Sequence, residues 1–292
     1  MRYACIAEQE SYYPREILCS VLEVSTSGYA NWKRGHQGRK RLSDAHLLVL
    51  IQAIHQESKG TYGSPRIFDE MKDAGYSVSR SRIERLMREH QIQARSKRRY
   101  RVTTDSNHGF AVAPNRLDRQ FNPSQPGHVY SADITFIPTG EGWLYLAVVL
   151  DLFDRSVVGW SMQNHMQTEL VSDALRMAYS RRRPEAGALH HSDRGSQYAS
   201  REFQTLLKEF GMVCSMSRKG NCWDNAPTES FFSRLKNERV HGARYACQDE
   251  AKADIFDYIE LFYNQRRRHS ALGGQSPHAV YSAWALKQNL TA

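Results

Sequence analysis

The sequence predicts two parts of different fold class, an all-helical region at residues 1–95 and a mixed α/β sheet that begins near residue 126. In the first part, apolar residues recur at helical spacing. From Gly127 onward, strand-like runs come first and then alternate with amphipathic stretches, which is typical of a mixed sheet with helices on both faces. Pro and Gly in NPSQPGH (122–128) mark the boundary, and residues 96–125 are expected to form a basic linker.

Two helix pairs are expected in the helical region, each with the outline of a helix-turn-helix. The first pair spans residues 14–35, where an apolar helical pattern is followed by a break and a Ser/Thr-rich helix start. A longer helix is expected over residues 44–56. The second pair spans residues 62–91, where Gly75 ends one helix and Ser79 can cap the next.

Basic residues line the exposed side of that last helix and continue beyond it, at Arg80, Arg82, Arg85 and Arg88 and then at Arg98 and Arg99. A plain helical bundle followed by a solvated linker explains each feature taken alone. The chain also carries 40 Lys and Arg against 31 Asp and Glu, a net charge of +9. Together these features favour a polyanionic partner, and we expect the helical region and linker to bind double-stranded DNA.

The second part is expected to contain five strands and four helices. The strands are HVYSADITFIP (128–138), GWLYLAVVLDL (142–152), RSVVGWSMQ (155–163), ALHHS (188–192) and MVCSMS (212–217). The helices are TELVSDALRMAYSRRR (168–183), SREFQTLLKEFG (200–211), one that begins near Asn225, and one over residues 249–264.

Composition excludes several other classes of protein. With 40% hydrophobic and 11% aromatic residues, the chain is expected to be globular. Its longest apolar run, WLYLAVVL (143–150), is too short to cross a bilayer, and the N-terminus has no signal-peptide pattern. The five cysteines form no C-x-x-C pair, so a structural zinc site is not expected. We therefore expect a cytoplasmic, nucleoid-associated protein without a membrane partner.

Three acidic residues stand in unusual positions. Asp133 lies inside a predicted strand, against the propensity of that residue, and Asp193 follows a short strand where ligands of α/β sheets gather. Glu229 lies in the first turn of a helix, three residues before Phe232 and on the flank of the expected buried face. Three carboxylates brought together repel one another, and divalent cations with oxygen ligands relieve that repulsion.

Other acids compete for such a site, namely Asp151, Asp154, Asp173 and Asp224. For any single acid, a surface charge or a helix cap is the more common role. Asp224 or Asn225 is expected to be the N-cap of the helix that carries Glu229, and Trp223 is expected to be a packed aromatic, with stacking on a DNA base as the alternative.

At these residues the chain resembles the DDE transposases of bacterial insertion sequences, relatives of retroviral integrases, and among them the OrfB type. Asp193 and Glu229 are separated by 35 residues, and Lys236 stands seven positions after Glu229, as in that family. Further matching segments are VSTSGYANW (24–32), GTYGSPRI (60–67), HSDRGSQY (191–198), SRKGNCWDNAPTESFFSRLKNE (217–238) and YNQRRRHSALGGQSP (263–277). The resemblance implies a ribonuclease-H-like catalytic core at residues 126–241, completed by a C-terminal helix and arm at residues 242–292.

The resemblance also implies metal-dependent cleavage and transfer of DNA strands at the ends of an insertion sequence. Asp133, Asp193 and Glu229 would hold two Mg²⁺ ions, for which Mn²⁺ can substitute. Lys236 and Arg234 would contact DNA phosphates near the cut, and Arg267 and His269 would contact the DNA backbone or brace the C-terminal arm. The implied partners are the element ends and target DNA, further copies of the chain, and an OrfA polypeptide from an upstream frame.

Two other functions are weighed against this one. Tyrosine recombinases need Arg, His and Tyr, which RRRHS (266–270) and Tyr281 offer, but that reading leaves the three acids unexplained. A DNA-binding regulator of transposition with a decayed catalytic domain is the non-enzymatic alternative. The presence of all three acids and of Lys236 speaks against decay.

Overall fold

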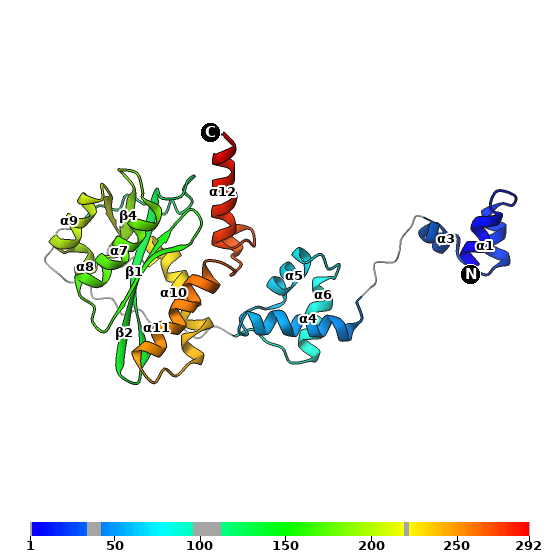
Figure 1. The fold of residues 1–292 in the computed structure, drawn as a ribbon, viewed down its shortest axis with the longest axis horizontal. Helices are drawn as coiled ribbons and strands as arrows, with labels where there is room; N and C mark the ends of the chain where they lie inside the picture. The colour runs from blue at the N-terminus through cyan, green and yellow to red at the C-terminus, as the bar shows by residue number, and fades with distance from the viewer. Residues whose placement is uncertain (1, 34–41, 96–111, 219–221, 292) are drawn as a thin grey trace. The chain divides into compact units, whose positions relative to one another are not determined.

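The computed structural model describes the whole chain except residues 1, 34–41, 96–111, 219–221 and 292. The chain divides into two compact units, Met1–Gln93 and Ala94–Ala292 (Figure 1). No helix in the described ranges is long and apolar enough to cross a membrane.

The unit Met1–Gln93 is helical, as the apolar periodicity predicts. Its helices are α1 (Arg2–Gln9), α2 (Arg15–Val21), α3 (Thr26–Lys33), α4 (Asp44–Glu57), α5 (Ser64–Asp73) and α6 (Arg80–Glu89). Ile6, Cys19 and Tyr29 form a small buried cluster among the first three helices. Both expected helix pairs are present, and Gly75, with a φ of +82°, follows α5 in the left-handed conformation that glycine tolerates best.

A five-stranded mixed sheet forms the centre of the unit Ala94–Ala292. Its strands are β1 (Val129–Thr139), β2 (Gly142–Asp151), β3 (Val157–Gln163), β4 (Leu189–Ser192) and β5 (Val213–Met216), in the order β3-β2-β1-β4-β5. β1, β2 and β3 are antiparallel neighbours, whereas β4 and β5 run parallel to β1. All five strands predicted from the sequence are confirmed.

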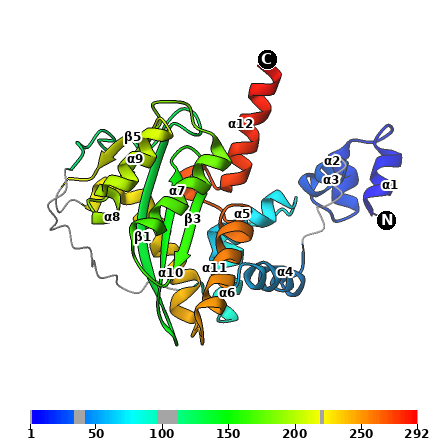
Figure 2. The ribbon, with the colours of Figure 1, turned by 60° about the vertical axis from the view of Figure 1, so that its left-hand side comes forward.

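Helices cover both faces of this sheet (Figures 1 and 2). On one face, α7 (Thr168–Arg182), α8 (Ser196–Ala199) and α9 (Arg201–Glu209) pack on Tyr130 and Ala132 of β1. On the other face, α10 (Ala226–Glu238), α11 (Gln248–Phe256) and the π-helical turn η3 (Asp257–Tyr263) pack on Ile137 of β1. The period-two alternation of strand side chains thus supplies two separate cores.

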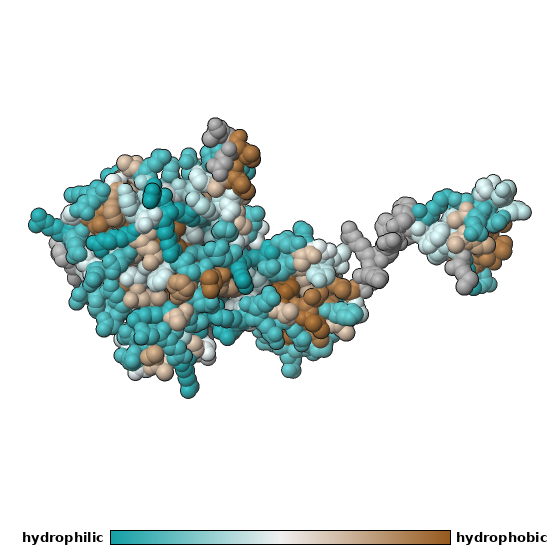
Figure 3. All heavy atoms as spheres, viewed as in Figure 1, coloured by the Kyte–Doolittle hydropathy of each residue, from teal (hydrophilic) through white to brown (hydrophobic). Residues whose placement is uncertain are grey.

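The C-terminal segment contributes residues as far as Tyr263 to the core on the α10 face of the sheet, and no described residue of the helix that follows is part of that core. The 3-10 turns η1 (Cys222–Asn225), η2 (Val240–Gly242) and η4 (Ser270–Leu272) connect the longer elements, and the last helix is α12 (Pro277–Thr291). Arg182 lies over the ring of Tyr281 at 3.8 Å and so ties the start of α12 to α7. Leu286 and Leu290, further along α12, are exposed. Figure 3 shows hydrophobic side chains on the surface of this helix.

Part of the predicted linker differs from expectation. Residues 112–121 do not bridge two domains but belong to the unit Ala94–Ala292. Leu117 is buried, and the backbone N–H of Arg116 donates to the hydroxyl of Ser215 on β5 at 2.9 Å. Arg98 and Arg99, the predicted DNA contacts of the linker, lie outside the described residues.

Candidate active site

Asp133 and Asp193 are brought to the same place by the parallel pairing of β1 with β4. The register pairs Ser131 with His191, and two residues further along each chain are Asp133 and Asp193. β4 ends at Ser192, so Asp193 stands at the carboxyl end of its strand. The strand pairing therefore aligns two acids that are far apart in the sequence.

Backbone amides orient both carboxylates. Oδ1 of Asp133 accepts a hydrogen bond from the N–H of Ile134 at 2.7 Å, and Oδ1 of Asp193 accepts one from the N–H of Gly195 at 2.9 Å. A β-carbon at position 195 would lie 3.0 Å from that same Asp193 oxygen. Glycine at 195 therefore lets the loop after β4 close tightly on the carboxylate.

Helix α10 is held against β1 by buried polar contacts of residues close in sequence to Asp133 and Glu229. The hydroxyl of Ser131 donates to the side-chain oxygen of Asn225 and lies 2.5 Å from the hydroxyl of Thr228. Nδ2 of Asn225 donates to the carbonyl of Ala132 at 3.1 Å. Because Thr228 immediately precedes Glu229, these bonds set where the first turn of α10 lies relative to β1.

The electrostatics of Asp133 reflect these neighbours. Burial raises the pKa of Asp133 well above its ordinary value, and the nearby negative charges of Asp193 and Glu229 raise it further. Partial burial also raises the pKa of Glu229, although its side chain is exposed, unlike the neighbouring Phe231 and Phe232. Glu229 follows the buried Thr228 and stands three residues before the buried Phe232, so it lies at the edge of the buried face of α10, where the sequence analysis expected it.

Lys236, two helical turns after Glu229, is buried. Its ammonium lies 4.9 Å from the centre of the Phe136 ring, a cation–π distance. Burial lowers the pKa of Lys236, and the attraction of Asp133 opposes this shift. A cation is thus held in the same neighbourhood as the acids, while Arg234 on the same helix is half-buried.

The donors at this site suit a hard divalent cation. Carboxylate oxygens are the protein ligands that Mg²⁺ takes, and the pKa of Asp133 is raised by burial first and by the negative charges of Asp193 and Glu229 second, both of which a bound cation would offset. Within the described ranges, however, no three His, Cys, Asp or Glu side chains are already arranged as a closed metal site. Asp133, Asp193 and Glu229 are therefore electrostatic neighbours that fit the group by chemistry, and their rotamers do not form a cage in this structure.

Two predicted DNA contacts near the C-terminus are placed differently. Arg267 is fully buried and forms a bidentate ion pair with Glu238, so the structure corrects its assignment to the DNA interface. His269 is 7% exposed, and its ring packs edge-on against Tyr263 with centroids 4.7 Å apart. Its backbone N–H donates to the carbonyl of Gln275, which agrees with the bracing role.

Arg80, Arg82 and Arg85 of α6 are held in ion pairs inside their own unit. Arg80 pairs with Glu84, whereas Arg82 and Arg85 both reach Asp44 at the start of α4 at 2.5 Å. Arg82 and Arg85 border a pocket that is also lined by Leu42, Ser43, Asp44 and Ser79. Contact with a phosphate at Arg82 or Arg85 would therefore have to compete with the carboxylate of Asp44.

The competing acids have other partners. Asp151 and Asp154 are buried beside Arg182, and Asp173 accepts a hydrogen bond from Gln163 and pairs with Arg176.

Asp224 is completely buried among arginines and is not a helix cap. Asn225 does stand at the N-cap position, but its side chain bonds β1 instead of the helix. Trp223 is 69% exposed, which corrects the expectation of a packed ring.

Sequence reasoning missed the residues that hold α10 against β1, above all Ser131 and Thr228. The alternation of β1 already put Ser131 and Asp133 on one face of the strand, so a second polar residue beside Asp133 was a usable signal. No comparable signal marked Thr228, because its partner lies 97 residues away.

Comparisons with known proteins point to one family. Two integrase core domain models match residues 123–222 and 210–277, and an HTH-like domain model matches residues 42–100. The insertion element IS600 uncharacterized 31 kDa protein of Shigella sonnei is 45% identical over 262 residues, which cover 90% of this chain and 96% of that protein. The transposase InsF for insertion sequence IS3A of Escherichia coli (strain K12) is 38% identical over 279 residues, which cover 95% of this chain and 97% of that protein.

Among solved structures, the integrase catalytic core domain of HTLV-2 in complex with magnesium aligns with a TM-score of 0.41 and 18% identity, over 54% of this chain and 98% of that one. The relatives show the family: the chain belongs to the insertion-sequence transposases that carry an integrase core domain. Its mixed five-stranded sheet with helices on both faces is the ribonuclease-H-like core that the resemblance implied, preceded by a helix-turn-helix-like domain.

Proposed function

We propose that the chain is the catalytic transposase of an insertion sequence, a metal-dependent polynucleotidyl transferase that uses Asp133, Asp193 and Glu229. The observation that carries this proposal is the register of β1 and β4, which aligns Asp133 with Asp193 beside the first turn of α10. The substrates are the element ends and the target, both double-stranded DNA. Mn²⁺ is expected to replace Mg²⁺, and two ions fit the two-step displacement best.

When bound, the metal supplies Lewis acidity toward the attacking water or 3′-hydroxyl and toward the departing oxygen. The residues of the chain contribute placement and charge. Asp133 and Asp193 are fixed by a sheet and by backbone amides, so little reorganisation is needed to present their second oxygens. The buried ammonium of Lys236 adds positive charge close to Asp133, where the scissile phosphate would lie.

A tyrosine recombinase fits the structure less well. In that class the arginine contacts the scissile phosphate, but Arg267 is sequestered on Glu238 and Tyr281 lies under the guanidinium of Arg182. That alternative requires a phosphotyrosine adduct, which a suicide DNA substrate would trap. A regulator without catalysis differs from our proposal by predicting DNA binding and no strand transfer.

The test is strand transfer on duplex oligonucleotides that carry the terminal repeats flanking the coding region. Asp193→Ala should retain DNA binding and lose Mg²⁺-dependent end cleavage and joining. Asp173→Asn, a rival acid that pairs with Arg176 on an exposed surface, should leave both unchanged. End joining by Asp193→Ala at the wild-type rate would sink the assignment.

Assembly and location are part of the same proposal. Bringing two element ends together requires at least two copies on DNA, and we propose a homo-oligomer on nucleoid DNA, assisted by an OrfA polypeptide from an upstream frame. Mixing full-length chain with and without that polypeptide in the strand-transfer assay tests whether the chain acts alone.

A further inference from the structure

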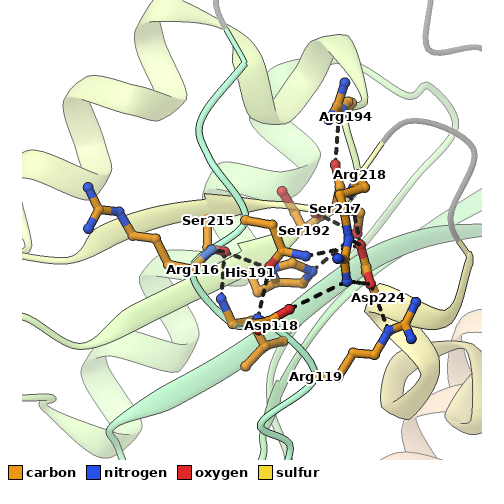
Figure 4. Close-up of polar contacts among 12 residues, drawn as sticks. Arg116, Asp118, Arg119, His191, Ser192, Arg194, Ser215, Ser217, Arg218 and Asp224 are labelled. Atoms are coloured by element: carbon orange, nitrogen blue, oxygen red, sulfur yellow. Dashed lines mark hydrogen bonds and ion pairs between the residues drawn. The ribbon is translucent and has the colours of Figure 1, made fainter.

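Asp224 lies near the candidate active site and accepts five hydrogen bonds, yet it is not one of the three acids (Figure 4). Its side chain is completely buried. Oδ1 accepts from Arg119 at 3.1 Å and from Nη2 of Arg218 at 2.9 Å, and Oδ2 accepts from Asn115, from the backbone of Arg218 and from its Nε, each at 3.0 Å. The pKa of Asp224 is held far below its usual value by Arg218 first, so the carboxylate stays ionised.

We call Asp224, Asn115, Arg119 and Arg218 the Asp224 clamp. Its members come from three segments: the stretch that leads into β1, the residue that follows β5 closely, and the turn η1 that leads directly into α10. Asp224 therefore joins both ends of the connection between β5 and α10. Because η1 leads directly into α10, the contacts of Asp224 also fix where the helix that carries Glu229 begins.

The clamp continues into the contacts that align the acids. The next residue, Asn225, bonds Ser131 and Ala132 immediately before Asp133, and Thr228 meets the same serine. A displacement of Asp224 would thus be passed to Glu229 through less than two turns of helix. The position of Glu229 relative to Asp133 and Asp193 therefore depends on this short segment.

A second path leads from the clamp segment to Asp193. Ser215 accepts hydrogen bonds from the N–H groups of Arg116 and Leu117, so its own proton is left for Nδ1 of His191 at 2.8 Å. Nε2 of His191 then donates to Ser217, whose hydroxyl donates to the carbonyl of Ser192. This neutral imidazole holds the strand end beside Asp193.

We propose that Asp224 is a positioning residue for the transposase reaction, whose ionised carboxylate places Glu229 against Asp133 and Asp193. This inference rests on the proposed function, because it assumes that those three acids bind the metal. An uncharged amide at position 224 would turn an NH₂ group toward an arginine and could not accept all five hydrogen bonds. The expected consequence is a misplaced Glu229 in a chain that still folds and binds DNA.

The matched variants are Asp224→Asn and Asp118→Asn. Asp118 pairs with the same arginine at 3.5 Å, but its side chain is 71% exposed, and its φ of +40° suits asparagine. Both variants remove one negative charge beside Arg218, so they differ only in whether the altered side chain is buried, as at Asp224, or exposed, as at Asp118. Asp193→Asn serves as the reference for loss of the site itself.

Two measurements on the full-length chain decide the matter. The first is Mn²⁺ binding followed by electron paramagnetic resonance, which needs no turnover, and the second is kcat and KM for DNA in strand transfer. Asp224→Asn should weaken Mn²⁺ binding and lower kcat by about 10- to 100-fold with little change in KM, as for other residues that orient metal ligands. Asp118→Asn should match the wild type in both.

Wild-type Mn²⁺ affinity and kcat in folded Asp224→Asn would overturn the inference and leave the proposed function standing. If Asp193→Asn also binds Mn²⁺ and transfers strands normally, the proposed function fails and the inference fails with it. Should Asp224→Asn not fold, Arg119→Gln decides, because it removes one hydrogen bond from a half-exposed side chain. It should weaken Mn²⁺ binding in the same direction by a smaller factor, and an unchanged affinity would refute the clamp.

Discussion

Arg267 forms a bidentate ion pair with Glu238, in which Nε donates to Oε2 at 2.8 Å and Nη2 donates to Oε1 at 2.6 Å. The hydroxyl of Tyr258 donates to Oε2 as well, at 2.8 Å. The guanidinium is fully buried, and the pair fastens the end of α10 to the segment that follows η3. An arginine that the sequence places in a basic run is therefore a structural residue of the core.

Truncation of that arginine should destabilise the catalytic unit. Arg267→Ala leaves the carboxylate of Glu238 buried without its main partner, which costs about 3–5 kcal/mol in the free energy of unfolding. Arg267→Lys should recover only part of the loss, because an ammonium cannot reproduce the fork. Denaturant unfolding of the full chain measures both. Arg266→Ala changes an exposed side chain and should have little effect, whereas equal losses for the two variants would contradict the buried pairing.

Acid should destabilise the same unit through its buried histidines. Burial lowers the pKa of His190 to about 3 and that of His191 to about 4, below the ordinary value near 6.5. The unfolded chain then binds more protons, so their stabilising contribution is present above about pH 6.5 and is lost as pH falls toward the folded pKa values. Each histidine contributes a slope of about 1.4 kcal/mol per pH unit in that window.

His190→Phe tests this origin of the acid sensitivity. The ring nitrogens of His190 have no hydrogen-bond partner among the described side chains, and the ring lies 5.4 Å from that of Phe203. Phenylalanine should therefore be tolerated at neutral pH and should make the loss of stability between pH 6 and 4 shallower by about 1.4 kcal/mol per pH unit, because His190 no longer titrates. Thermal unfolding across pH provides the slope. His128→Gln, at an exposed position, should keep the wild-type slope.

Release of the α6 arginines should strengthen DNA binding. Asp44→Asn removes the carboxylate that both Arg82 and Arg85 contact, although Arg85 keeps its pair with Glu89. Each of these cations that meets a phosphate adds about 0.9 to the slope of log affinity against log salt. Titration of labelled duplex DNA at several salt concentrations would show higher affinity and a steeper slope. Asp69→Asn removes the same charge from α5 without releasing either arginine. If both variants gained the same DNA affinity, the change in net charge alone would explain the effect and the prediction would be wrong.

Asn264 should prove essential for the edge of the sheet. Its side chain accepts from the N–H of Val157 and donates to the carbonyl of Val157, both at 2.9 Å, and so stands in for a neighbouring strand beside β3. Asn264→Ala leaves two backbone groups without these partners and should cost about 2 kcal/mol or more. Asn264→Asp should be no better, since it would face the Val157 carbonyl with an oxygen. Amide hydrogen exchange at the start of β3 reports the loss, and Gln265→Ala, an exposed neighbour, is the control.

The sequence alone determined the order of helices and strands, because side-chain periodicity and the residues at element ends act over a few positions. It also singled out Asp133, Asp193 and Glu229, since an acid in a strand interior or at a strand end conflicts with its local surroundings.

Only the tertiary structure decided which side chains meet. Arg266 and Arg267 are alike in sequence, yet one is exposed and the other is buried on Glu238, 29 positions away. Asp224 became the centre of a clamp instead of a helix cap, and Arg82 and Arg85 were drawn to Asp44. Such pairings depend on packing between segments that are far apart in the sequence. Local sequence patterns do not determine which of these segments come into contact.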